Sequence, residues 1–116
     1  MEMVWPEIIV EILKNGIPLR EIGINNWALS KNETLEAIDK FKKLGIPVLG
    51  GDVCQKIDSV MRLSYDNWYC NKNEEETIEE FTIRSCKKAK TYIEVFPINK
   101  PGKTYFVIVP DFRNDQ

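Results

Sequence analysis

The chain has 116 residues, carries 16 Lys and Arg against 18 Asp and Glu, and contains no histidine. This length suits one domain around one hydrophobic core, and the 43% hydrophobic and 29% charged fractions are ordinary for a soluble globular protein. The lack of histidine excludes Ser-His-Asp and Cys-His catalytic sites and histidine-ligated zinc. We therefore expect residues 1–116 to form one domain that is not an enzyme of these classes.

The sequence also disfavours several ligands and locations. No apolar run reaches the roughly 20 residues that span a bilayer, and no secretory signal begins the chain, so we expect a cytoplasmic protein without membrane contact. Its three cysteines, Cys54, Cys70 and Cys86, lack metal-binding spacing, which favours reduced thiols. Phosphate-binding glycine motifs are absent, since only the pair Gly50-Gly51 occurs. We predict no cofactor and no metal.

Two helices with similar ends are predicted in the first half of the chain. The first covers residues 6–15, has proline in its first turn, and stops at Gly16. The second begins with the capping box Ser30-Lys31-Asn32-Glu33, and Gly45 ends it. Between them we expect a short extended piece over residues 21–23.

Short strands are predicted in the middle of the chain. Val48-Leu49 follow a proline and precede two glycines, so we expect a strand that ends at Gly50-Gly51 in a bulge or a turn. Residues 59–63 and 68–70 are further candidate strands. This part of the chain is therefore predicted to be a meander.

A long helix over residues 75–93 is predicted from apolar residues at helical spacing. Acids at its start and bases at its end complement the helix dipole and favour pairs such as Glu80 with Arg84. The apolar strand over residues 105–109 is predicted to be central. The fold class is thus α/β or α+β: a single compact domain whose mixed sheet, with one parallel crossover, is covered by about three helices.

Three aspartates in the middle segment raise an enzymatic alternative. Asp52, Asp58 and Asp66 would serve a small carboxylate-dependent hydrolase if the fold brought at least two of them together. Aspartate also serves turns, where its side chain bonds its own backbone, and turn chemistry is the commoner role. The sequence does not decide between them.

The same segment is acidic and aromatic. Residues 51–80 hold eight acids and three bases, which disfavours direct nucleic acid binding and favours a basic protein partner. A solvent-exposed face that binds no partner would explain this excess of acidic residues more simply. Tyr65, Trp68 and Tyr69 are either core anchors or interface residues, and we expect Trp68 to be buried and at least one of the tyrosines to lie near solvent.

Four motifs occur in an order that resembles an immunity-protein family of bacterial polymorphic toxin systems. They are Asn26-Trp27-Ala28-Leu29, Gly50-Gly51-Asp52-Val53, Ser64-Tyr65-Asp66-Asn67-Trp68-Tyr69 and Tyr105-Phe106-Val107-Ile108-Val109. The resemblance covers residues 8–110. It implies a small non-catalytic protein that binds and neutralises the C-terminal domain of a cognate toxin, for which an acidic surface suits a basic nuclease.

The resemblance assigns no contact residues, so we chose candidates by charge, expected exposure and nearness in the sequence. The predicted partner-binding residues are Asp52, Asp58, Asp66, Tyr69, Glu74 and Glu75. A generic protein-binding adaptor would share these features and is the second alternative. It would lack a toxin gene beside its own.

Overall fold

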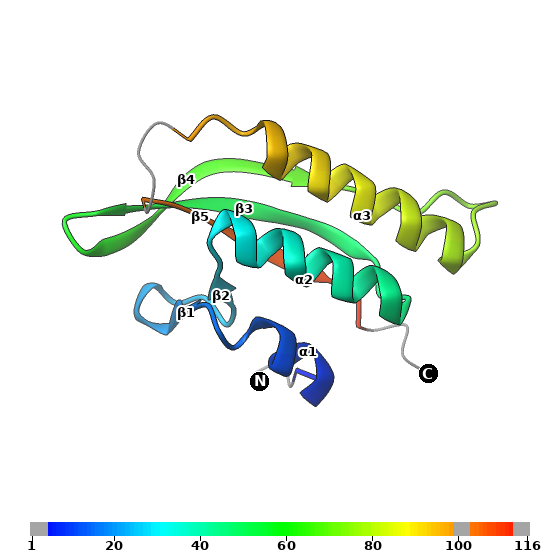
Figure 1. Ribbon diagram of the computed structural model, residues 1–116, viewed down its shortest axis with the longest axis horizontal. Helices are drawn as coiled ribbons and strands as arrows, with labels where there is room; N and C mark the ends of the chain where they lie inside the picture. Colours follow the sequence, from blue (N-terminus) through cyan, green and yellow to red (C-terminus); the bar gives the residue numbers. More distant parts are fainter. Residues whose placement is uncertain (1–4, 99–102, 113–116) are drawn as a thin grey trace.

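The computed structural model describes residues 5–98 and 103–112, which form an α+β fold (Figure 1). The elements in chain order are α1 (Glu7–Leu13), β1 (Ile17–Pro18), a 3₁₀ helix η1 (Arg20–Ile22), β2 (Trp27–Ala28), α2 (Lys31–Leu44), β3 (Val48–Ile57), β4 (Val60–Tyr69), α3 (Ile78–Val95) and β5 (Thr104–Pro110). The predicted class and the predicted α-helices are confirmed.

The main sheet has the strand order β4-β3-β5, and β1 pairs with β2 in a small second sheet. The strand pairs within the described residues are antiparallel, so the prediction of a mixed sheet with parallel pairing was wrong. The reason is that β4 and β5, joined through α3, run in the same direction but lie on opposite sides of β3. The central strand is therefore β3, and not residues 105–109 as predicted; the outer edge of β5 meets Leu29 in a bridge to Phe106.

The ends of the helices follow their sequence signals. Ser30 Oγ accepts the Glu33 amide at 3.2 Å and the Glu33 carboxylate accepts the Ser30 amide at 2.9 Å, which confirms the capping box of α2. Gly45 closes this helix with a φ of 73°. A second capping box joins Thr77 and Glu80 at the start of α3. The predicted Glu80–Arg84 pair was wrong, because the Glu80 carboxylate accepts the Thr77 amide instead.

Three predicted boundaries in extended regions were wrong. The strand β3 continues through Gly50-Gly51 to Ile57, although a register shift beside Gly50 confirms the expected bulge. The predicted strands over residues 59–63 and 68–70 fall, except for Ser59 and Cys70, within the single strand β4. Residues 20–22 form a 3₁₀ turn where a short extended piece over residues 21–23 was expected.

The core lies on both faces of β3. On one face α2 and α3 lie side by side across the sheet (Figure 1), and they bury Phe41, Ile93, Phe106 and Ile108 with Val53. On the other face the segment of residues 17–28 covers Cys54 and Val107 with Leu19 and Ala28. One end of β4, and the outer edge of this strand, remain at the surface.

Candidate protein-binding surface

A bulge in β4 exposes a tyrosine in an unusual backbone conformation. The register of β3 with β4 shifts between Asp52, which pairs with Asn67, and Cys54, which pairs with Leu63. Residues 64–66 of β4 therefore lie opposite one residue of β3. Within the bulge Tyr65 has a φ of 70° and is 84% exposed. A non-glycine residue in this left-handed region is strained, and such strain is concentrated at functional positions.

The bulge is held by its own side chains. Ser64 Oγ donates to the Asp66 carboxylate at 3.0 Å and lies 3.3 Å from the Asp66 amide, which donates to it. Asn67 Nδ2 donates to the Tyr65 carbonyl at 3.1 Å. These bonds occupy main-chain groups at the open edge of the sheet, and bulges of this kind protect an edge against addition of a foreign strand. The edge offers its side chains to a partner more readily than its backbone.

The end of β4 is tied to α3 beside a second exposed tyrosine. Lys88 Nζ donates to the Tyr69 carbonyl at 2.6 Å and lies 5.5 Å from the centre of the Tyr69 ring, which is a cation–π arrangement. Tyr69 is 67% exposed. On β3, Gly50 pairs with Tyr69, and the half-buried Asp52, which pairs with Asn67, has a pKa raised by its burial. This end of the strand thus combines a backbone hydrogen-bonded to α3 with one solvent-facing aromatic ring.

The structure brings some of the predicted contact residues together and separates others. We use the name bulge surface for Asp52, Tyr65, Asp66, Asn67 and Tyr69, which share β4 and its pairing partner on β3. Asp58 lies at the tip of the β3–β4 hairpin, whereas Glu74 and Glu75 lie in the β4–α3 loop at the opposite end of the long axis (Figure 1). The six predicted residues therefore do not form one continuous patch.

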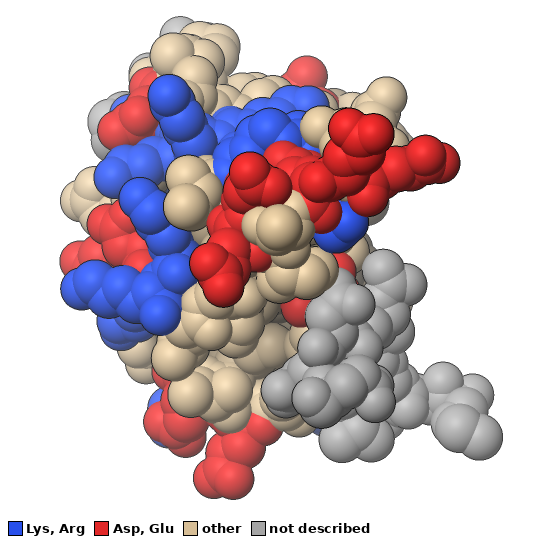
Figure 2. Space-filling model, turned by 90° about the vertical axis from the view of Figure 1, so that its right-hand side faces the viewer, with Lys and Arg blue, Asp and Glu red and all other residues tan. Residues whose placement is uncertain are grey.

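The loop that carries Glu74 and Glu75 begins an acidic region at one end of the molecule. Figure 2 faces this end and shows acidic side chains gathered beside a basic area. One acid is neutralised there: Glu76 accepts from Arg84 Nε at 2.6 Å, and Arg84 also donates to the Asn71 carbonyl at 2.6 Å. The hydrogen bonds that the Glu76 carboxylate accepts, from Arg84 first and then from the Asn73 amide, lower the pKa of Glu76 to about 2. Glu74 and Glu75 are exposed.

Sequence reasoning left Tyr65 out of the contact set. The signal that indicates it is the pattern Ser-Tyr-Asp-Asn, because Ser, Asp and Asn side chains bond neighbouring main-chain groups and favour departures from regular pairing. A residue enclosed by three such neighbours is a candidate for an outward-facing side chain. Burial of Trp68, by contrast, was predicted and is confirmed.

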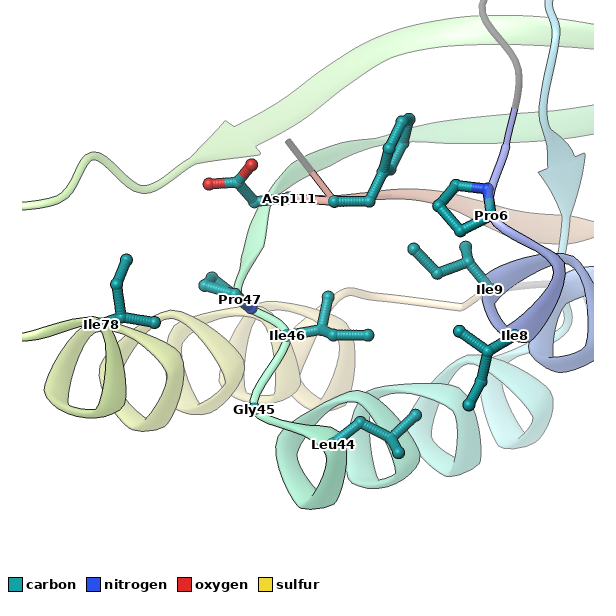
Figure 3. Close-up of a pocket in the computed structure, with 10 residues that line it drawn as sticks. Pro6, Ile8, Ile9, Leu44, Gly45, Ile46, Pro47, Ile78 and Asp111 are labelled. Atoms are coloured by element: carbon teal, nitrogen blue, oxygen red, sulfur yellow. The ribbon is translucent and has the colours of Figure 1, made fainter. Parts of the chain in front are cut away.

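An apolar pocket of about 240 Å³ lies between α1, the end of α2 and the start of α3 (Figure 3). Ile8 and Ile9 of α1 lie across it from Leu44 and Ile46. Among the described residues that line it, Asp111 is the one acid, and Asp52, Asp58 and Asp66 do not contribute. The carboxylate-dependent hydrolase considered above needs at least two convergent aspartates, so this pocket does not support that alternative.

Two further properties bear on the predicted ligands and location. Over residues 5–98 and 103–112, no three Asp, Glu or Cys side chains lie close enough together to hold a metal ion. No helix of this described part is both long and apolar enough to cross a membrane.

Comparison with known proteins gives one match. The family model described as immunity protein 40 matches residues 18–110, which is most of the 116-residue chain. The match includes the bulge surface and the β3–β4 hairpin and begins after α1. Neither the curated proteins nor the solved structures contain a match.

Proposed function

Because the chain belongs to the immunity protein 40 family, we propose that it binds the C-terminal domain of a cognate bacterial toxin and blocks that domain's active site by occlusion. Binding would occur in the cytoplasm of the producing cell, where an active toxin domain would do damage. The observation that carries the proposal is the bulge of β4, which presents the exposed Tyr65 on a strained but internally bonded backbone.

Tyrosines of this kind suit an anchoring role. Tyrosine supplies a large apolar ring and a polar hydroxyl at a low cost in conformational entropy, and it is enriched among the residues that dominate binding energy. Tyr65 and Tyr69 sit on a hydrogen-bonded strand and are therefore positioned before any partner arrives. Preorganised contacts increase affinity because little order is lost on binding.

The charge of the same region suits a basic partner. Asp66 is exposed beside Tyr65, and Glu74 and Glu75 extend the negative charge toward the start of α3. Complementary charges accelerate encounter and discriminate among partners. A basic nuclease domain is the toxin class that we propose on this ground, and direct nucleic acid binding by this chain is not part of the proposal.

Co-expression tests the proposal. The C-terminal domain encoded by the adjacent open reading frame should arrest growth alone, and this chain should restore growth and bind the purified domain. Tyr65→Ala should weaken binding by about tenfold or more, the range of a hot-spot residue. Ile83→Ala, an exposed aliphatic on α3, is the matched control and should leave binding within about twofold.

The results separate the proposal from the adaptor alternative. Failure of the wild-type chain to bind the adjacent toxin domain, or binding without rescue, would contradict neutralisation. Binding that Tyr65→Ala and Ile83→Ala affect equally would contradict the role of the bulge surface while leaving neutralisation intact.

A further inference from the structure

The tip of the β3–β4 hairpin exposes an apolar pair on a projecting ribbon. Ile57 and Val60 pair across the hairpin and are 51% and 46% exposed. The register of β3 with β5 ends at Gln55. The Lys56 amide still donates to the Lys103 carbonyl at 2.7 Å, and beyond Lys56 the hairpin is two-stranded and reaches past the ends of the helices (Figure 1). About half of each of these two aliphatic side chains is therefore left uncovered by the described part of the domain.

The turn at the tip keeps side chains where glycine would be easier. Asp58 and Ser59 have φ values of 50° and 67°. Two-residue hairpin turns with positive φ at both central positions favour Asn-Gly, because glycine adopts this conformation without strain. An Asp-Ser turn retains a carboxylate and a hydroxyl at the most projecting point of the hairpin in spite of that strain. Strained positions with exposed side chains are candidates for contacts.

The apolar surface continues from the tip into a hollow. A hollow of about 200 Å³ lies between the hairpin and the 3₁₀ turn, and Val60 and Met61 line it together with Ile17 and Ile22. Ile22 is itself partly exposed. The tip therefore protrudes beside a recess. A surface of this shape is more complementary to a partner with a concave site than to a flat one.

The hairpin and the bulge surface lie within reach of one partner. Both are on β4, whose ten residues span roughly 30 Å at the usual rise per residue of a strand. A standard interface buries about 800 Å² on each partner, which corresponds to a patch roughly 30 Å across. A single toxin domain that covers the bulge surface can therefore also receive the hairpin tip.

We infer that the hairpin tip, residues 57–60, inserts into the active-site cleft of the toxin domain while the bulge surface anchors that domain alongside. This inference rests on the proposed function. Ile57 and Val60 would contact apolar walls of the cleft, and the Asp58 carboxylate would meet a Lys or Arg that the toxin uses for its substrate. The toxin's rim would lie in the hollow beside Val60.

Paired variants test the insertion with the purified C-terminal domain from the adjacent open reading frame as the probe. The double variant Ile57→Ala/Val60→Ala should weaken binding about tenfold or more and release toxin activity. Its control, Ile83→Ala/Val95→Ala, removes two aliphatics of comparable exposure (56% and 71%) from α3 and should change neither. Equal effects of the two double variants would overturn the inference.

A second variant keeps the test independent of folding. Asp58→Asn/Ser59→Gly installs the preferred turn sequence, so the thermal midpoint should stay the same or rise while toxin binding weakens. Unchanged binding of this variant would count against insertion of the tip. If the wild-type chain fails to bind the probe, the proposed function fails. If Tyr65→Ala weakens binding and the hairpin variants do not, only this inference fails.

Cross-linking locates the tip in the complex. The native cysteines Cys54, Cys70 and Cys86 are buried, so a photoreactive maleimide would label Ser59→Cys selectively. Irradiation should give adducts with residues that line the toxin's catalytic cleft. Adducts confined to residues outside the cleft would overturn the insertion.

Discussion

The indole ring of Trp68 stacks on the phenol ring of Tyr92, with the ring centroids 4.6 Å apart and the planes inclined by 29°. This stacking joins β4 to α3 across the face of Gly51. A Cβ atom added to Gly51 would lie 2.4 Å from the Trp68 ring and 2.3 Å from the Val107 carbonyl oxygen. The lack of a side chain at Gly51 thus leaves the space that the Trp68 ring occupies.

The first prediction concerns this close approach. Gly51→Ala should destabilise the fold by roughly 3 kcal/mol, because backbone on one side and a stacked indole on the other leave no room for a methyl group. Gly45→Ala is the matched control: its added Cβ meets nothing within 4 Å, and only the φ of 73° opposes it, at a cost of about 1 kcal/mol. Urea unfolding measures both. Equal losses would mean that the contacts at Gly51 are not decisive.

The second prediction concerns acid stability. The Arg84 hydrogen bonds hold the pKa of Glu76 at about 2, below its ordinary value of 4.5. Because the folded pKa is depressed, the contribution of Glu76 to stability is present above pH 4.5 and is lost as the pH falls toward 2. Glu76→Gln should therefore reduce the pH dependence of the unfolding midpoint in this window. Glu79→Gln, which removes an exposed acid from the first turn of α3 and leaves the Glu76–Arg84 contact in place, is the control and should keep that dependence.

These two sites show what the sequence could predict about the fold. Local signals sufficed for the helices, because capping boxes and glycine stops act within a few residues, as at Ser30 and Gly45. The pair Gly50-Gly51 led to a wrong prediction of where β3 ends, because glycine is typical both of turns and of places where another chain segment packs closely on the backbone. Here the packing segment contains Trp68, which is distant in the sequence. The position of β3 between β4 and β5 depends on long-range pairing, which has no local signature.

The candidate surface was only partly predictable for the same reason. Acidic and aromatic composition indicated the segment around Asp66 and Tyr69, since both properties are read directly from residue types. Nearness in the sequence suggested that Asp58 and Glu74 belong to one patch. The extended strand β4 lies between them, however, and the two ends of an extended strand are far apart. The exposure of Tyr65 follows from a bulge, and a bulge is a property of two strands together.

The third prediction tests the strain at the bulge. Tyr65→Gly should leave the free energy of unfolding unchanged or raise it by up to about 1 kcal/mol, because glycine accepts a φ of 70° and the exposed ring contributes little to the core. Tyr69→Gly, at an exposed strand position without positive φ, should instead lower it by about 1 kcal/mol. Chemical denaturation of the two variants gives the comparison. A clear loss of stability in Tyr65→Gly would show that the ring is structural.

The fourth prediction concerns the rate of toxin association. Reversing the charge with Asp58→Lys/Asp66→Lys should slow association with the cognate toxin domain at low salt by roughly tenfold, and the difference should shrink as salt screens the charges. Glu36→Lys/Glu94→Lys provides the control, because it changes the net charge by the same amount at exposed acids on α2 and α3, outside β4. Stopped-flow measurements across a salt series would resolve the effect. An association rate at low salt that the double reversal leaves unaltered would argue against steering by these aspartates.

The fifth prediction concerns the thiols. Burial raises the pKa of Cys54 to about 11, with the charge of Asp52 adding to the effect, and burial likewise raises the pKa of Cys86 to about 11. Since the thiolate is the reactive species, both cysteines should resist iodoacetamide at pH 8 in the folded protein and react once urea unfolds it. Because the folded pKa values exceed the unfolded value of 9.0, stability should fall as the pH rises from 9 toward 11. Mass spectrometry of the alkylated chain shows which cysteines have reacted in the folded and in the unfolded protein. Rapid labelling of Cys54 under native conditions would contradict the prediction and would mean that residues 17–28 readily expose the sheet face that they cover.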